Sequence, residues 1–341
     1  MNIFVTCKSG FEQILSRELV LNKFSSIKNG SGWVLANIDE SLGLPDTRCR
    51  EMCFPLIMLE NPLNIEGSSV NNFVETLISI FIDKIKAMKI ESTWFYGFSS
   101  AGEDNCVQRV KTIEQSWFEK LRKRMSRVAK LAKNGIPYSS NFLFGFFVYF
   151  IDSKHAFVSL QAMAFGQQRM QMDARAPSRS YLKVEEAYQI MGIGPKAGET
   201  VIDLGAAPGG WTYSALKRGA NVIAVDNGAL TDELLTYPNV KHLKEDALSF
   251  HPPSLKCVDW LFCDIIEKPE LIMRLIKKWV ENKWCHKFII NFKVGYADPI
   301  TVIEKIRNPQ TGLISLCKLF KIRQLYHDRE EITVMGEVKI I

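Results

Sequence analysis

Three aspartates in the second half of the sequence each follow a short apolar segment. Asp226 ends "NVIAVD", Asp246 lies in "KEDAL" after a further apolar run, and Asp264 ends "VDWLFCD". If these segments are parallel strands, the aspartates meet at the sheet edge where open α/β folds bind ligands. Any one of them could instead cap a helix. Three in succession favour a ligand site, in which Asp226 has the position of an acid that accepts hydrogen bonds from ribose hydroxyls.

A glycine-rich turn precedes these aspartates. The segment "VIDLGAAPGGWTYSALKRG" (201–219) predicts a strand, a turn and a helix. Such a turn lets the backbone approach a ligand and directs helix N–H groups at it. The GxGxxG spacing of dinucleotide sites is missing and Pro208 lies inside the turn, so an NAD-dependent oxidoreductase is disfavoured. We predict that the turn bends around an adenosyl group and that the acidic edge suits a cationic sulfonium donor.

A lysine ends an otherwise apolar strand, "FIINFKVGY" (288–296). The residues before it suit a buried strand, whereas lysine is almost never fully buried without a partner. Lys293 is therefore either an exposed residue at a strand end or a functional amine at the same edge as the aspartates. Its position alone does not separate these two interpretations.

The segments that must position these residues alternate between strand and helix patterns. The apolar runs "VIDL", "NVIAVD", "VDWLFCD" and "FIINFK" are separated by helix-length segments, which predicts a mostly parallel α/β sheet. The C-terminal "KIRQLYHDREEITVMGEVKII" contains two strand-like runs with only "HDRE" between them. This ending predicts an antiparallel closing hairpin.

The first half of the chain predicts a mixed α+β arrangement. Helices are expected over 11–21 and 70–88, and strands over 30–38 and 93–100. The apolar "FLFGFFVYFI" (142–151) has about half the length of a membrane helix. A second strand-like run follows it, so a buried hairpin is expected.

A basic segment from Val107 to Lys133 predicts one long helix or two. After Glu119 it carries seven cations and no acid: Lys120, Arg122, Lys123, Arg124, Arg127, Lys130 and Lys133. Most such runs are solvated faces, but like charges at i, i+4 repel and a polyanion would relieve the repulsion. We therefore favour contact with nucleic-acid phosphates. Arg175 and Arg179, in a polar segment with linker composition, could reach phosphates as well.

The overall composition is that of a globular protein, with 47% hydrophobic and 23% charged residues. The 341 residues predict two or three domains. Eight cysteines and five histidines are dispersed without a CxxC pair, which argues against a metal site. No export signal or membrane segment is recognisable, so we expect a cytoplasmic protein with reduced thiols.

Six segments together resemble a known family. They are "SRSYLKVEEAY", "DLGAAPGGWTY", "VDNG", "CDIIEKP", "NFKVGY" and "LYHDREEITV". They are similar to motifs of the FtsJ-like, S-adenosylmethionine-dependent RNA 2′-O-ribose methyltransferases. Within these, the resemblance is closest to the ribosomal RNA large subunit methyltransferase M group (RlmM). Over residues 1–165 it depends on the order of elements and on "GFEQILSREL".

The resemblance implies a fold class and a domain order. A Rossmann-like methyltransferase domain, with a mostly parallel sheet and an antiparallel closing hairpin, is expected over 180–341. An α+β ferredoxin-like domain over 1–65, a THUMP RNA-binding domain over 66–165 and a linker over 166–179 are expected before it.

The resemblance also implies site residues. The Lys-Asp-Lys-Glu catalytic set of the family corresponds to Lys183, Asp264, Lys293 and Glu331, with Glu330 as the alternative to the last. Without the resemblance, Lys183 could be a solvated helix residue and Glu331 an edge-strand charge. The S-adenosylmethionine donor would be held by Ser180, Gly205, Ala207, Pro208, Gly209, Gly210, Asp226, Asp246 and Asp264. Ala207 stands where cysteine is frequent in relatives, a change that a backbone contact would survive.

The implied reaction is 2′-O-methylation of ribosomal RNA. The expected target is a cytidine of 23S ribosomal RNA or of a large-subunit precursor, with no obligate protein partner. No Asn-Pro-Pro-Tyr or Asp-Pro-Pro-Tyr motif of base-nitrogen methyltransferases is present. A catalytically silent RNA-binding assembly factor and a methyltransferase acting on tRNA are the alternatives.

Two roles are open for Lys293 in such a reaction. It would act as the base if burial and Lys183 lower its pKa. If it stays charged, it would stabilise the developing alkoxide.

Overall fold

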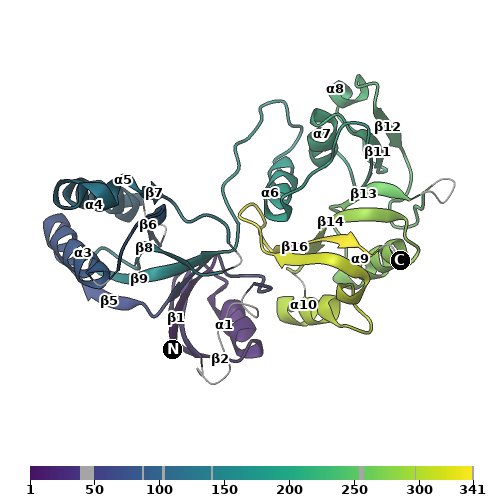
Figure 1. The fold of residues 1–341 in the computed structure, drawn as a ribbon. Helices are drawn as coiled ribbons and strands as arrows, with labels where there is room; N and C mark the ends of the chain where they lie inside the picture. The colour runs from purple at the N-terminus through teal and green to yellow at the C-terminus, as the bar shows by residue number, and fades with distance from the viewer. Residues whose placement is uncertain are drawn as a thin grey trace. The chain divides into compact units, whose positions relative to one another are not determined.

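The computed structural model divides the chain into two compact units, Met1–Gly166 and Gln167–Ile341 (Figure 1). It describes residues 1–38, 50–86, 88–101, 104–139, 141–252, 257–295 and 297–339. Cys49, and Tyr296 of the "NFKVGY" segment, lie outside these ranges. None of the helices in the described ranges is long and apolar enough to cross a membrane.

The first unit is built on one mixed sheet. The described strands are β1 (Asn2–Thr6), β2 (Phe24–Gly30), β3 (Trp33–Ile38), β4 (Ile57–Glu60), β5 (Leu63–Glu66), β6 (Trp94–Ser100), β7 (Ala132–Asn134), β8 (Leu143–Phe150) and β9 (His155–Ala164). They are joined in the order β2-β3-β1-β4-β9-β8-β6-β7, and β5 also pairs with β9. The expected buried hairpin is confirmed, because β8 and β9 are antiparallel and mostly buried.

Helices of this unit pack against the sheet. They are α1 (Glu12–Leu21), α3 (Val70–Ile85), α4 (Asp104–Arg124) and α5 (Ser126–Lys130). Phe81 of α3 and Trp117 of α4 share one core with Phe146 of β8, and Trp117 stacks on Phe146 at a centroid distance of 4.9 Å. The basic segment is thus two helices followed by a short strand, which contains Lys133. The division of this unit into ferredoxin-like and THUMP domains stays a prediction.

The second unit confirms the parallel sheet with an antiparallel closing hairpin. Its described strands are β10 (Thr200–Leu204), β11 (Asn221–Val225), β12 (Val240–Leu243), β13 (Val258–Cys263), β14 (Cys285–Lys293), β15 (Cys317–Arg323) and β16 (Glu331–Val338). Their order is β12-β11-β10-β13-β14-β16-β15. The first five are parallel, whereas β16 runs antiparallel to both β14 and β15.

Helices lie on both faces of this sheet, with α6 and α7 on one side and α9 and α10 on the other (Figure 1). The described helices are α6 (Tyr181–Met191), α7 (Gly210–Lys217), α8 (Asp232–Leu235), α9 (Pro269–Glu281), α10 (Pro299–Arg307) and the 3₁₀ turn η3 (Ile314–Leu316). Helix starts follow local chemistry: α10 has proline at its first position, and Asp298 accepts a hydrogen bond from Thr301 N at 3.1 Å. Coverage on both faces explains the continuously apolar strands and leaves the carboxyl edge of β10, β11 and β13 for a ligand.

Candidate active site

Four charged side chains from distant parts of the sequence converge at the end of β14. Lys293 and Glu331 lie directly opposite each other in the antiparallel pair of β14 and β16. Asp264 follows β13, the parallel neighbour of β14, and Lys183 comes from α6. The structure therefore brings the four predicted catalytic residues together.

The cluster alternates cations and carboxylates. Lys293 Nζ donates to Asp264 Oδ1 and lies 3.3 Å from Glu331 Oε2. Lys183 Nζ donates to Glu331 Oε2 and lies 3.8 Å from Asp264 Oδ2. The side chains are between 11% and 18% exposed, so they are largely buried but still reached by water. The interpretation of Lys183 as a solvated helix residue is wrong.

The electrostatics of Lys293 bear on the two roles left open for it. Burial acts to lower its pKa, but the charges of Asp264 and Glu331, with hydrogen bonds to both, outweigh burial and raise the pKa above the ordinary value. Without ligands the amine is therefore charged. The same contacts act on the pKa of Glu331: burial raises it, Lys183 and Lys293 lower it, and the net pKa is below its usual value.

The glutamate of the cluster is Glu331, and its neighbour Glu330 points elsewhere. Glu330 lies over Gly295, since a Cβ added at that glycine would be 2.5 Å from Glu330 Oε2. The backbone carbonyl of Glu330 accepts a hydrogen bond from Val294 N at 2.8 Å. The geometry thus separates two adjacent carboxylates that the sequence could not.

The glycine-rich turn is tightly enclosed. Gly209 has φ 115°, in the left-handed region that favours glycine. A Cβ at Gly210 would meet Ser178 Oγ and lie 2.5 Å from Ser180 Oγ, and these two hydroxyls are hydrogen-bonded at 2.6 Å. The Ser180 carbonyl accepts a bond from Trp211 Nε1 at 3.0 Å. The start of α7 therefore faces a hydroxyl pair in a space that only glycine leaves open.

Asp226 and Asp246 lie after neighbouring strands at the same edge. Asp226 accepts hydrogen bonds from Ala207 N at 2.9 Å and Gly228 N at 2.7 Å, which fixes its carboxylate beside the turn. Asp246 is exposed and accepts from Leu248 N at 3.1 Å, a contact that also fits a turn cap. Their roles toward a donor stay predictions.

These groups fit S-adenosylmethionine, which supplies a methyl group activated by a sulfonium charge. The narrow turn at Gly209 and Gly210 admits close backbone approach, the hydroxyls of Ser178 and Ser180 are oriented toward it, and the Asp226 carboxylate is fixed beside it. Ser178 was not among the predicted residues, although it belongs to the "SRS" segment.

Two further buried polar residues were missed. Asp203, inside β10, accepts from Thr212 Oγ1 at 2.6 Å, and burial raises its pKa to about 7. Asn291, two residues before Lys293, donates to both Asp264 and Glu331. A buried aspartate or asparagine inside an apolar strand gives no sequence signal of its partners, although both lie in the family-like motifs.

The predicted RNA-binding residues are only partly free of acidic partners, contrary to expectation. Glu75 of α3 forms ion pairs with Lys120 and, at 3.7 Å, with Arg124. Arg175 pairs with Asp173 at 3.3 Å. Arg124 and Arg175 are exposed despite these ion pairs, and Lys123, Arg127, Lys130 and Arg179 are exposed as well. The claim that no acid compensates the basic run is therefore wrong, because the acid comes from a neighbouring helix.

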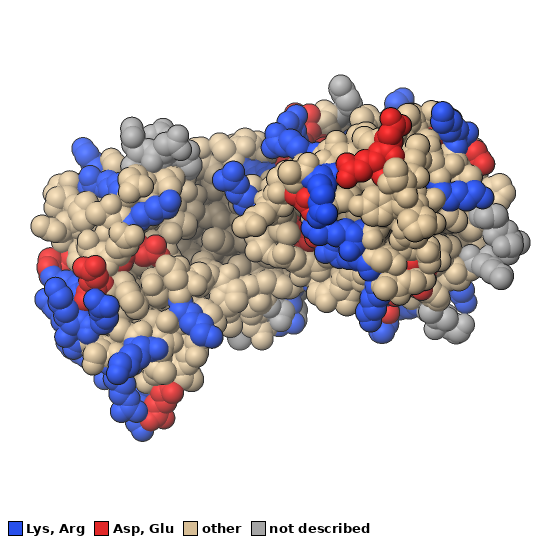
Figure 2. Space-filling view, turned by 90° about the horizontal axis from the view of Figure 1, so that it is seen from above, with Lys and Arg blue, Asp and Glu red and all other residues tan. Residues whose placement is uncertain are grey.

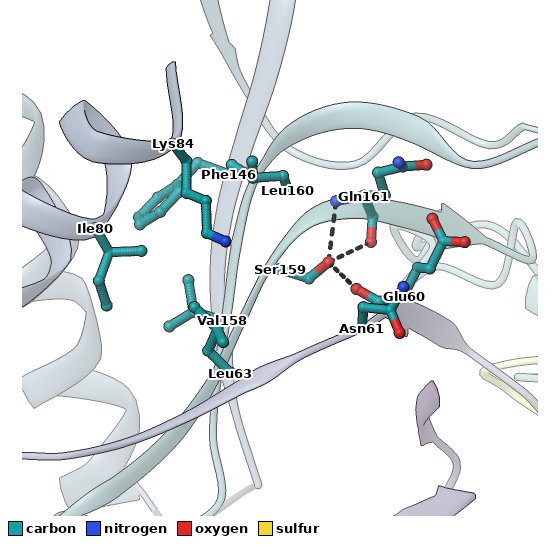
Figure 3. A pocket seen from close by; sticks show the side chains of 10 residues that line it. All are labelled: Glu60, Asn61, Leu63, Ile80, Lys84, Phe146, Val158, Ser159, Leu160 and Gln161. Carbon is teal, nitrogen blue, oxygen red and sulfur yellow. Dashed lines mark hydrogen bonds between the residues drawn. The ribbon is translucent and has the colours of Figure 1, made fainter. Parts of the chain in front are cut away.

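A separate pocket in the first unit lies between α3 and the β8–β9 region (Figure 3). Its polar centre, Ser159 Oγ, donates toward the Glu60 carbonyl and accepts from Gln161 N at 3.0 Å. Lys84 extends over it from α3. The hydroxyl of Ser159 is thus engaged by backbone groups.

Potential metal ligands are not clustered in the described part of the chain. Within the described ranges, no group of three or more histidine, cysteine or acidic residues could hold a metal ion.

Comparison with known proteins assigns the chain to a family. The sequence pattern of the FtsJ-like methyltransferases matches residues 176–307. A ribosomal RNA large subunit methyltransferase M from Actinobacillus pleuropneumoniae serotype 3 (strain JL03) is 30% identical, over 96% of this chain and 96% of its own. The chain belongs to the ribosomal RNA large subunit methyltransferase M family. It is thus a methyltransferase that uses S-adenosylmethionine.

Other members of the family match to different extents. The protein of that name from Marinomonas sp. (strain MWYL1) is 27% identical over 99% of both chains. The one from Aggregatibacter aphrophilus (strain NJ8700) is 43% identical over 51% of this chain and 50% of its own.

Proposed function

We propose that this chain transfers the methyl group of S-adenosylmethionine to the 2′-hydroxyl of a cytidine in 23S ribosomal RNA. The observation that carries the proposal is the cluster of Lys183, Asp264, Lys293 and Glu331 beside the glycine-rich turn. The names of the family members support RNA of the large subunit as the substrate, either free or in a precursor particle. An enzyme that acts on this RNA works in the cytoplasm.

The chemistry follows from the cluster. Methyl transfer to oxygen is an in-line displacement that needs the hydroxyl held at near-attack distance from the methyl carbon. The hydroxyl is a poor nucleophile, and as the bond to the methyl carbon forms its proton passes to water at the partly exposed edge of the cluster, while the methyl–sulfur bond breaks and neutral S-adenosylhomocysteine leaves. Lys293, charged in the absence of ligands, is placed to donate a hydrogen bond to the developing alkoxide. Asp264 and Glu331 keep both amines oriented.

A catalytically silent RNA-binding factor is disfavoured by the same geometry. A protein without the activity would have no need to keep these four residues. Here the two amines and two carboxylates are all present, paired and largely buried. Folding alone gains little from such an arrangement, because burying ions carries a desolvation penalty.

Transfer of label from S-[methyl-³H]adenosylmethionine to undermodified 23S ribosomal RNA tests the proposal. The wild type should label the RNA, and alkaline hydrolysis should leave the label in a dinucleotide resistant to cleavage. Lys293→Ala should reduce the rate by about 10²- to 10⁴-fold while retaining affinity for S-adenosylhomocysteine.

Lys287→Ala is the matched control. Lys287 lies on the same face of β14, where it pairs with Glu199 at 3.7 Å far from the cluster. No labelling by wild type, or equal rates for both lysine variants, would refute the assignment. Label in tRNA alone would identify the alternative substrate.

A further inference from the structure

A buried asparagine lies at the centre of the charged cluster. Asn291 and Lys293 are two residues apart on β14, so their side chains lie on the same face. Asn291 is fully buried, opposite Thr333 of β16. Its Nδ2 donates to Asp264 Oδ1 at 3.0 Å and also to Glu331 Oε2. One amide thus bridges two carboxylates that come from different strands.

The bridge fixes the carboxylates in a way that the lysines do not. Glu331 Oε2 accepts from Lys183 and Asn291 and faces Lys293, while Asp264 Oδ1 accepts from Lys293 and Asn291. Lysine side chains are flexible and their ammonium groups are point charges. The amide is short, planar and held by the strand, so it sets the direction of both carboxylates without adding charge.

Asn291 keeps this arrangement at a cost to folding. Its Oδ1 is buried without a hydrogen-bond partner among the described residues, and a buried unsatisfied acceptor is unfavourable. The neighbouring strand positions Ile289, Ile290 and Phe292 are apolar and buried. An apolar residue at position 291 would avoid the unsatisfied oxygen, but it would leave Asp264 and Glu331 unbridged.

We propose that Asn291 is a positioning residue for methyl transfer, which holds Asp264 and Glu331 so that Lys293 is presented to the acceptor hydroxyl. This inference rests on the proposed function and adds a fifth member to the predicted set. Asn291 acts through the two carboxylates and does not touch the reacting atoms.

Two near-isosteric substitutions separate positioning from packing. Asn291→Leu replaces the amide with an apolar side chain of similar size, and Asn291→Asp replaces the donor with a carboxylate of nearly the same shape. Both should lower kcat by about 10- to 100-fold. The KM for RNA and the Kd for S-adenosylhomocysteine should stay within about twofold of wild type. Ile289→Leu, a change on the same face of the strand, should leave kcat unchanged.

A second readout needs no RNA and no activity. The neutral fraction of Lys293 can be followed by competitive labelling with acetic anhydride at pH 8, with Lys287 as the internal reference. Loss of the amide leaves the carboxylates more available to the lysine, so labelling of Lys293 should fall by about three- to tenfold in Asn291→Leu, which introduces no charge of its own. A purely structural role predicts no such change in a folded variant.

The outcomes distinguish the two proposals. Inactive wild type with altered Lys293 labelling in the variants would refute the proposed function and leave only the effect of Asn291 on the charged cluster. Active wild type with unchanged kcat and labelling in both variants would overturn the role of Asn291. Loss of kcat in proportion to loss of folded protein, with normal labelling, would overturn it as well.

Discussion

At the scale of single residues, the cluster holds one protonated amine, that of Lys293, where the acceptor hydroxyl would lose its proton. Lys293 is held in its charged form by Asp264 and Glu331, although burial opposes this. To act as a base, Lys293 would first have to lose its proton, and with it the ion pairs to Asp264 and Glu331 that favour the charged form. Stabilisation of the alkoxide needs no such change, and the ligand-free structure therefore favours it.

Two adjacent glutamates provide a test of this arrangement. Glu331→Gln removes the partner of Lys183 and one of the charges that raise the pKa of Lys293, so that pKa should fall. Without the oriented amines, methyl transfer should slow by about 10- to 100-fold. Glu330→Gln changes a side chain that lies over Gly295 and should keep the rate within about twofold. Initial rates at saturating donor measure both, and similar losses in the two variants would contradict the assignment.

Because Asp203 is buried, we predict an unusual dependence of the free energy of unfolding on pH. Burial is the main cause that raises its pKa from 3.8 to about 7, and the charges of Asp264 and Asp226 add to it, while Thr212 opposes. Between these values the folded protein binds a proton that the unfolded chain has lost. The free energy of unfolding should therefore fall as pH rises from about 4 to 7, by up to about 4 kcal/mol.

Asp203→Asn removes this titration. Urea unfolding followed by circular dichroism gives the free energy of unfolding of each protein. The value for the wild type minus the value for the variant should be more positive at pH 5 than at pH 8. A difference that does not change with pH would show that the carboxyl is not titrating in this range.

At the scale of elements, the turn before α7 depends on a contact with a segment about 30 residues earlier. Gly210→Ala would place a methyl group against Ser178 and Ser180. Helix propensity alone predicts a small gain in stability for this change. Displacement of the hydroxyl pair predicts instead that affinity for S-adenosylhomocysteine falls about tenfold, or by about 1.4 kcal/mol.

Calorimetric titration distinguishes these two results. Gly97→Ala is the control, because its added methyl would lie 3.4 Å from Ile136 in the first unit, an ordinary contact. Unchanged donor affinity in Gly210→Ala would remove the hydroxyl pair from the donor site.

Local patterns predicted the elements of the second unit better than its contacts. Hydrophobic runs indicated β10, β11, β13 and β14, and the short "HDRE" connection indicated the antiparallel hairpin, because these signals are local. The pairing of Lys183 with Glu331 spans 148 residues and was indicated by the family resemblance alone. Asn291 and Asp203 were not predicted from the sequence, because a buried polar residue is recognised by its partners in space and not by its neighbours in sequence.

In the first unit the same limit appears in the basic segment. Its charges were visible in the sequence, but Glu75 lies on α3 and reaches Lys120 and Arg124 only through helix packing. A count of charges along one helix therefore overestimates the cations available to a partner.

At the scale of the whole molecule, each unit has its own sheet and core, and the segment after Gly166 belongs to the second unit. Met170 N donates to His327 Nε2 at 2.8 Å, and Asp173 accepts from Tyr213 and Lys217. This segment leads directly to Ser178, Ser180 and Lys183. Its hydrogen bonds therefore fix the start of α6, which carries Lys183 of the cluster.

We propose that the first unit contributes RNA affinity through the cations of α4 and α5. Figure 2 shows lysine and arginine side chains gathered on this unit beside a few acidic ones. Lys123 and Arg127 are exposed, so Lys123→Glu with Arg127→Glu should weaken binding of 23S ribosomal RNA and reduce its salt dependence. The slope of log K against log salt should decrease by about 0.7 to 0.9 for each phosphate that no longer has a cation partner.

Glu75→Gln should act in the opposite direction, and this is the sharper test. It frees Lys120 and Arg124 from their ion pairs, so RNA should bind more tightly and with a steeper salt dependence. Glu337→Gln, at an ion pair with the exposed Lys318 in the second unit, changes the net charge by the same amount and is the control. Filter binding across a salt series measures all three. If Glu75→Gln and the double reversal both leave the slope unchanged, the basic helices are a solvated face, and the RNA contacts lie elsewhere on the molecule.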